Sequence, residues 1–387
     1  MRWRILALLF FARVGLGFQF QSLGSVADAL VDDFGMDYAR IGLLIGLFMA
    51  PGLFLALPAG FLSRYVADHK LIVLGLGALA LGGALSGLAQ NSATIGLGRL
   101  IAGAGFVLAN LYLTKIVVDW FETREIATAM SVLVMSWPFG VAMGQVGHVW
   151  LAQTFDWRAA FLVASAYGAL AACAMALLYR PPAGAASGPA RASFRMSARE
   201  WSLIICAGMA WGLFNAGYVV YLSFAPAMLV SLGQGAVAAA GIISVGSWLM
   251  LLSGTTCGWI ADRYGRQNII LAICICAAML AMMLLSLPGA GLPASLLFGL
   301  LGMAPVGLIM ALAGQAVAPE RRAFGMGVFF TIYHAFMTAA PPVAGAIFDR
   351  AGTPQAVLWF GIMLFAAVLP ATYAYRVIRA RPLPDPK

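Results

Sequence analysis

Long apolar stretches alternate with short polar segments along the entire chain. A helix of about 20 residues crosses the hydrocarbon core of a bilayer, so each stretch predicts a membrane-spanning helix. The predicted spans cover residues 5–30, 41–62, 71–90, 94–118, 127–151, 159–179, 201–230, 237–260, 269–287, 294–318, 324–348 and 357–378. The pattern therefore predicts an all-α polytopic membrane protein with twelve transmembrane helices.

The polar segments repeat with one spacing. Residues 258–266 read Gly-Trp-Ile-Ala-Asp-Arg-Tyr-Gly-Arg, and a degraded copy lies 198 residues earlier. The same offset pairs Trp3 with Trp201 and Gly35 with Gly233. A single offset of half the chain indicates an internal duplication, which is common among membrane transporters. We therefore expect two pseudo-symmetric six-helix bundles.

The segment between the halves is rich in Pro, Gly and Ala and carries scattered Arg. This composition is typical of a flexible tether. We expect an N-terminal bundle over residues 1–180, a cytoplasmic linker over 181–200, and a C-terminal bundle with a short basic tail over 201–387.

Composition and charge agree with a membrane location. Hydrophobic residues make up 63% of the chain and charged residues 10%, against about 25% charged in soluble proteins. Seventeen Lys and Arg fall in the segments on one side of the predicted spans and three in the opposite loops. The excess marks the cytoplasmic side. We therefore expect a multi-pass protein of a bacterial-type inner (plasma) membrane with both termini in the cytoplasm, and no nucleic-acid partner.

No pattern in the chain indicates enzyme chemistry. The five cysteines all fall within predicted spans. We find no His, Cys, Asp and Glu spacing typical of a metal site, no Gly-x-Ser-x-Gly elbow, and no phosphate-binding loop followed by Lys. We therefore expect no catalytic residues, no metal and no cofactor.

The segment 258–266 resembles the loop signature of the major facilitator superfamily, Gly-x-x-x-Asp-Arg-x-Gly-Arg. Four further elements resemble that superfamily in the same order along the chain. They are Gly98 to Gly105, Asp156 to Phe161, Pro319 to Arg322 and Gly345 to Gly352. The resemblance implies the major facilitator fold, a substrate held between two bundles near mid-membrane, and a monomer.

In that family the loop ties helix ends together on the cytoplasmic side when the cavity opens outward. A carboxylate is favoured near a helix N-terminus, and here the Asp version stands in the second half. We expect an asymmetric cytoplasmic latch that is stronger in the second half. The gating and structural residues that we expect are Asp262, Arg263, Arg266, Arg64, Arg124 and Arg322.

Ionisable residues inside the spans are costly and therefore point to function. Arg13, Arg99 and Lys115 lie within predicted spans, together with His148 and His334, whereas the fourteen acids lie in loops or at span ends. The interior charge is therefore positive, which favours an anionic substrate.

Arg13 lies in a Gly- and Gln-rich part of the first span. Its side chain could reach back to the headgroups, or it could face the cavity and bind a planar anion by paired hydrogen bonds. We favour the cavity, with Gln19 as a further donor.

The other interior residues each have two interpretations. Arg99 organises helix contacts, by the resemblance, or else contacts substrate. Lys115 either reaches the interface or guides substrate in the inner vestibule. His334 is a hydrogen-bonded core residue, or a substrate donor or titrating site.

One face of the seventh span is aromatic and polar. Trp211, Asn215, Tyr218 and Tyr221 recur at helical spacings. This face suits either a substrate-binding wall or packing between helices, and we favour binding by Asn215, Tyr218 and Tyr221.

The sequence therefore predicts a secondary active transporter that moves a small anion, inorganic or carboxylate, by alternating access. Exchange and proton-coupled symport are both open. The chain looks most like cyanate and nitrate/nitrite-type anion carriers or carboxylate exchangers. Alternatives are a proton-driven exporter of hydrophobic compounds and a membrane sensor that does not transport.

Overall fold

The structure is a computed structural model that describes residues 2–59, 62, 65–121, 125–180, 196–318 and 321–380, and only the backbone of 127, 322 and 323. Arg64, Arg124, the linker segment 181–195 and the tail 381–387 lie outside the described residues, as does the side chain of Arg322.

The described chain is helical. Its elements are α1 (Arg2–Ser25), α2 (Ala27–Phe34), α3 (Tyr38–Leu47), α4 (Pro51–Ala59), α5 (Asp68–Gly87), α6 (Ser92–Trp120), α7 (Ile126–Thr154), α8 (Trp157–Leu178), α9 (Ala198–Ser231), α10 (Ala236–Tyr264), α11 (Gln267–Leu284), α12 (Gly291–Leu297), the π-helical turn η2 (Phe298–Gly302), α13 (Val306–Ala316), α14 (Arg322–Ala351) and α15 (Pro354–Ala380).

These helices confirm the predicted membrane spans. Eleven helical segments of the described chain are long and apolar enough to cross a bilayer, with α3 and α4 counted together as Tyr38–Ala59 and α12 to α13 as Gly291–Ala316. The remaining predicted span is α14, which is 30 residues long. The predicted first span differs, because α1 ends at Ser25 and a separate short helix α2 follows.

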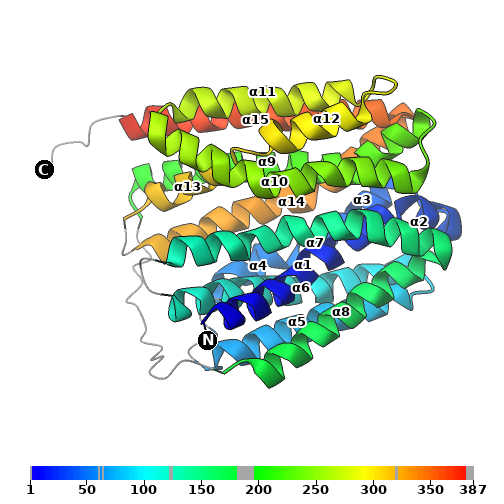
Figure 1. The fold of residues 1–387 in the computed structure, drawn as a ribbon, viewed down its shortest axis with the longest axis horizontal. Helices are drawn as coiled ribbons and strands as arrows, with labels where there is room; N and C mark the ends of the chain where they lie inside the picture. The colour runs from blue at the N-terminus through cyan, green and yellow to red at the C-terminus, as the bar shows by residue number, and fades with distance from the viewer. Residues whose placement is uncertain are drawn as a thin grey trace, which may run out of the picture.

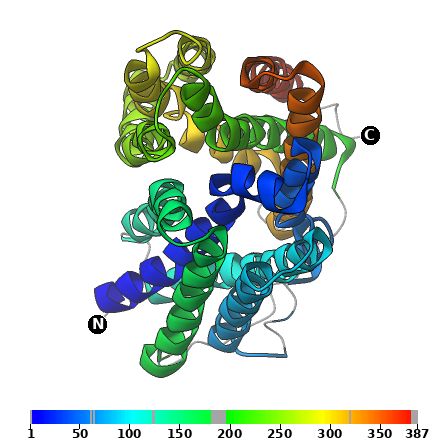
Figure 2. The ribbon, with the colours of Figure 1, turned by 90° about the vertical axis from the view of Figure 1, so that its right-hand side faces the viewer.

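The helices form two groups, α1 to α8 and α9 to α15, which lie one above the other in Figure 1 and are seen from one end in Figure 2. Helix α1 begins and α15 ends at the same end of the molecule, which we call the terminal end (Figure 1). The opposite end is the distal end. The duplication is visible in the backbone, because Gly35 and Gly233 both adopt a left-handed conformation, with φ of 60° and 91°.

The two groups touch along α3, α4 and α14, and along α7 and α10. Helix α3 approaches α14 at backbone distance. A Cβ atom on Gly42 would lie 2.1 Å from the carbonyl oxygen of Pro341, and one on Gly46 would lie 2.3 Å from that of Thr338. Only glycine allows this approach. The backbones of α3 and α14 therefore meet directly at these two positions.

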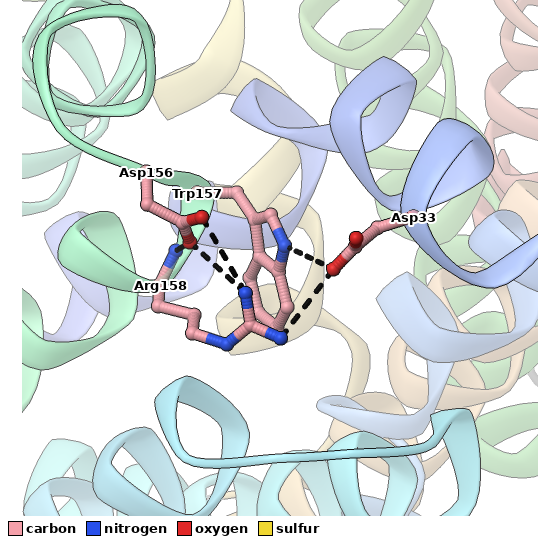
Figure 3. A network of polar contacts seen from close by, with 4 residues as sticks. All are labelled: Asp33, Asp156, Trp157 and Arg158. Atoms are coloured by element: carbon pink, nitrogen blue, oxygen red, sulfur yellow. Dashed lines mark hydrogen bonds and ion pairs between the residues drawn. The ribbon is translucent and has the colours of Figure 1, made fainter.

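A polar network at the distal end fixes α2 onto α8 within the first group (Figure 3). The Trp157 indole donates to Asp33 Oδ2 at 2.9 Å, and Arg158 Nη2 lies 3.4 Å from the same oxygen. The Arg158 guanidinium also lies over the Trp157 ring, 4.3 Å from its centroid. Asp156 begins α8 by accepting from Arg158 N at 2.8 Å. The sequence element at 156–161 thus has a structural role, because it holds α2 against the start of α8.

Candidate functional site

Arg13 lies in the middle of α1 and points toward α6 and α7. Its Nε donates to Asn110 Oδ1 at 3.0 Å. Its Nη1 donates to the carbonyl oxygens of Leu133 and Val134, at 2.8 and 3.2 Å, and lies 3.3 Å from Ser136 Oγ. None of these partners carries a charge, and Arg13 forms no ion pair within the described part of the chain.

A proline in α7 explains this contact. Pro138 lies inside the helix and has no N–H, so the carbonyl of Val134, four residues earlier, loses its helical donor. Arg13 Nη1 donates to that carbonyl. The guanidinium thus donates to the Val134 carbonyl, which would otherwise have no partner within the helix. This hydrogen bond also fixes the direction of the Arg13 side chain.

The second terminal nitrogen of Arg13, Nη2, makes no hydrogen bond among the described residues, although Nε and Nη1 are both used. The Arg13 side chain is half-buried. Tyr333 of α14, in the other group, lies within electrostatic range of it. Tyr333 in turn packs near Trp211 of α9, with ring centroids 6.3 Å apart. Tyr333 is therefore the residue of the second group that interacts with Arg13 across the region between the groups.

Arg99 has a different environment. Its side chain is fully buried inside the first group. Its three nitrogens donate to the carbonyl oxygens of Leu44, Gln19 and Phe20 at 3.1 to 3.3 Å. This geometry ties α6 to α1 and α3, and leaves no donor nitrogen of Arg99 for a substrate.

The structure does not bring Gln19 to Arg13. Gln19 is fully buried against Gly83 of α5, and neither atom of its amide has a hydrogen-bond partner. The reason is helical rotation, because six residues at 3.6 per turn place Gln19 roughly 120° around α1 from Arg13.

Tyr218 and Tyr221 also lie away from Arg13. Both are buried inside the second group, where their hydroxyls lie 2.6 Å from Ser247 Oγ and 2.7 Å from Ser295 Oγ. Ten residues rotate Tyr221 roughly 80° from Trp211. Trp211 therefore packs near α14, whereas Tyr218 contacts α10 and Tyr221 contacts α12. Asn215 and Trp211 are half-buried, and the Asn215 amide donates to the Trp211 carbonyl at 2.8 Å.

Lys115 and the loop residues lie toward the terminal end. Lys115 Nζ is 2.7 Å from Asp68 Oδ2, so its charge is already paired. Asp262 and Arg266 are exposed and, within the described residues, form no ion pair. Arg263 lies over the Trp259 ring at 5.5 Å. The described part of the predicted latch, Asp262, Arg263 and Arg266, therefore shows no ion pair that joins helix ends.

The groups are joined by polar contacts at the distal end. Asp349, near the end of α14, accepts from the backbone N–H groups of Tyr38 and Ala39 at 2.9 and 2.7 Å. Asp37 accepts from the next N–H of α3, that of Arg40, at 2.8 Å. A carboxylate from the second group thus satisfies two of the unpaired donors at the start of α3. A third contact is donated by Gln145 to the Leu222 carbonyl at 3.2 Å.

The described polar contacts at the terminal end lie within each group and do not join the two groups. The ion pairs there join residues of the same group, such as Arg2 with Glu125 and Arg321 with Glu200. No salt bridge among the described residues crosses between the groups. Hydrogen bonds therefore join the groups at the distal end, while at the terminal end polar residues hold each group together separately.

Sequence reasoning missed several of these residues. Asn110 is an uncharged polar residue among apolar neighbours in α6, and Ser136 precedes a proline by two positions. The position of Pro138 could have identified the Val134 carbonyl as a group that needs a donor. No local signal could have paired Asp349 with the start of α3, 311 residues away.

Comparison with known proteins agrees with the fold. The profile of the Major Facilitator Superfamily matches residues 9–335. A gallate transporter of Pseudomonas putida is 23% identical, over 95% of this chain and 90% of its own. A probable 4-methylmuconolactone transporter of Cupriavidus pinatubonensis is 21% identical, over 90% of this chain and 84% of its own.

A solved structure has a similar fold. The crystal structure of a bacterial homologue of the human lysosomal transporter Spinster superposes with a TM-score of 0.75 and 16% identity, covering 97% of this chain and 96% of that one. The two helical groups, the membrane spans and the profile match lead to one conclusion. The chain is a transporter of the Major Facilitator Superfamily, to which it belongs through most of its length.

Proposed function

We propose that this protein is a secondary active carrier for a small organic anion, and that Arg13 holds the carboxylate of its substrate. The observation that carries the proposal is the guanidinium of Arg13 inside a membrane-spanning helix, whose Nη2 makes no hydrogen bond among the described residues while Nε and Nη1 are held by neutral partners. A charged donor in a low-dielectric setting binds a carboxylate more strongly than a neutral one does.

The distribution of charge supports an anion. Every described Asp and Glu lies at a helix end or in a connection, so no carboxylate inside a span competes for Arg13 or attracts a cation. The relatives support it too, because gallate, named for the Pseudomonas putida protein, is a carboxylate. The rings of Tyr333 and Trp211 supply an aromatic surface for a flat acid.

The orientation follows from the excess of Lys and Arg at the terminal end. With that end in the cytoplasm of a bacterial-type inner membrane, the contacts of Asp349 close the outer side and the arrangement faces inward. Transport then requires the groups to rock, breaking the distal contacts and closing the terminal end. Importing one negative charge costs about 2.3 kcal/mol per 100 mV. Uptake therefore needs exchange with another anion or a co-transported proton.

Counterflow in proteoliposomes tests the proposal with radiolabelled gallate and a panel of other carboxylates. We expect Arg13→Lys to raise the half-saturating concentration about 10- to 100-fold, because a hydrogen bond to a charged group contributes about 1.5–3 kcal/mol. Lysine keeps the positive charge and a donor for the Val134 carbonyl. The substitution therefore removes only the two parallel hydrogen bonds that a guanidinium makes to a carboxylate. Lys115→Ala is the matched control, since Asp68 already neutralises Lys115.

Two results would oppose the proposal. One is a half-saturating concentration for carboxylate flux that does not change in Arg13→Lys. The other is an absence of carboxylate flux together with movement of a lipophilic dye, which would identify an exporter of hydrophobic compounds. Ligand binding without flux would instead indicate a sensor.

A further inference from the structure

His334 lies on the surface of α14 that meets α4 of the other group, and 5% of it is exposed. Its Nδ1 is 2.7 Å from the Phe330 carbonyl. Because a carbonyl only accepts, Nδ1 carries the hydrogen and Nε2 has the free lone pair. That Nε2 is buried and has no hydrogen-bond partner.

The surroundings of Nε2 suit a neutral ring. The ring lies directly against Gly52, where a Cβ atom would be 2.1 to 2.4 Å from the His334 Cδ2, Nε2 and Cγ atoms. Helix α4 begins at Pro51 and contains no ionisable side chain. A protonated Nε2 would therefore be a buried cation without an acceptor, which is costly. This inward-facing arrangement favours the deprotonated form.

His334 is also linked to the proposed substrate site. The Tyr333 ring lies 5.0 Å from the His334 ring, and Tyr333 is within electrostatic range of Arg13.

Within the described part of the chain, no charged group faces His334 from the helices packed against α14. Helix α13 contains no ionisable side chain, and Arg376 and Arg379 of α15 lie near the terminal end of that helix. On α3 the ionisable residues Tyr38 and Arg40 lie at the distal end, where Tyr38 contacts the region of Gly345. Helix α9 meets α14 through Gly208 and Gly212, which face Ile332 and Phe336.

We propose that His334 is the proton-binding residue of this carrier. It takes up a proton at Nε2 when the distal end is open and loses that proton as the ring becomes buried against Gly52 on the way to the arrangement described here. The inference rests on the proposed function and adds its coupling ion. One proton then enters with one monovalent anion, so the pair carries no net charge and the membrane potential no longer opposes uptake.

Two other titratable residues serve less well. His148 lies wholly inside the first group, with Nε2 2.9 Å from the Phe18 carbonyl, so rocking of the groups does not change its partners. Asp28 is exposed at the distal end and accepts from the Tyr38 hydroxyl at 2.8 Å. It is reachable from that end alone, whereas a coupling residue must meet each side in turn.

A distance measurement tests the proposal without a substrate. Spin labels at positions 155 and 287, both exposed beyond the distal helix ends of different groups, are placed in a full-length chain whose native cysteines are replaced. Acidification from about pH 8 to 5.5 covers the range in which an imidazole titrates. We expect the distal distance to lengthen in the wild type and in His148→Gln, and to be independent of pH in His334→Gln.

The proposal is overturned if the distal distance in the wild type does not change with pH. This outcome is measured on the wild type alone, so it does not depend on whether a variant folds. The proposal is also overturned if His334→Gln responds like the wild type, or if Asp28→Asn removes the response and His334→Gln does not.

Transport gives a second readout with radiolabelled gallate. A pH gradient of one unit sustains up to about tenfold accumulation per proton. We expect His334→Gln to lose this accumulation and to keep counterflow, which a merely structural defect would also abolish. Wild-type counterflow without pH-driven accumulation refutes the proton site alone. Absence of counterflow for every carboxylate refutes the proposed function.

Discussion

Asp349 offers a direct test of how the distal end is held closed. Its carboxylate accepts from two first-turn N–H groups of α3 in the other group. Loss of such a helix-capping acceptor costs about 0.5–2 kcal/mol, and loss of the charge near the helix N-terminus about 0.3–1 kcal/mol. The site is exposed, so water partly replaces the carboxylate. We therefore expect Asp349→Ala to destabilise distal closure by about 1–2 kcal/mol, a factor of about 5–30 in the closed-to-open ratio.

The assay uses a cysteine placed at Ser223, which lines a cavity of about 60 Å³ at the distal contact between the groups. A membrane-impermeant maleimide is added from outside in a background without native cysteines. The labelling rate should rise about 5–30-fold in Asp349→Ala, and less in Asp349→Asn, which keeps one acceptor oxygen.

Asp33→Asn is the matched control. It removes the same charge at the same end, but its partners Trp157 and Arg158 belong to the same group as Asp33 (Figure 3). Its labelling rate should equal that of the wild type. Equal rates in Asp349→Ala and the wild type, or an equal rise in Asp33→Asn, would refute the assignment of Asp349 as a contact that closes this end.

Three further outcomes are expected. Arg99→Ala removes three buried hydrogen bonds to backbone carbonyls, so thermal unfolding of the detergent-solubilised protein should show a loss on the order of 3 kcal/mol. Gly46→Leu places side-chain atoms where a Cβ already lies 2.3 Å from the Thr338 carbonyl oxygen, so counterflow should be lost while the halves remain folded by circular dichroism. Tyr221→Phe removes the bond to Ser295 and should cost about 1 kcal/mol of stability with unchanged half-saturation in counterflow.

The fold was predictable because membrane spans are long and their apolar composition is directly readable. The duplication was also readable, since Gly35 and Gly233 share both an offset and a left-handed backbone. Breaks within spans were less visible. Pro51 marks the start of α4, but the sequence alone does not distinguish a proline that ends a helix from one such as Pro138 that continues within it.

The candidate site was only partly predictable. The position of Arg13 within a span was readable, and its cost in a membrane pointed to function. Its neighbours were not, because which residues share a helix face with Arg13 depends on rotation, and Gln19 falls on the wrong side. Tyr221 is a similar case, since a repeat of four, three and three residues drifts around a helix over ten residues. The start of α3 shows a third limit, since it is completed by Asp349 from the distant half of the chain.

The anchoring of Arg13 has a consequence for how the cargo travels. Asn110, Leu133, Val134 and Ser136 all belong to the same half as Arg13. The guanidinium therefore moves as a rigid part of that half. Its hydrogen bonds do not have to break and re-form when the other half moves. An anion bound to Arg13 would keep the same protein contacts throughout the cycle, while the distal and terminal ends open and close in turn.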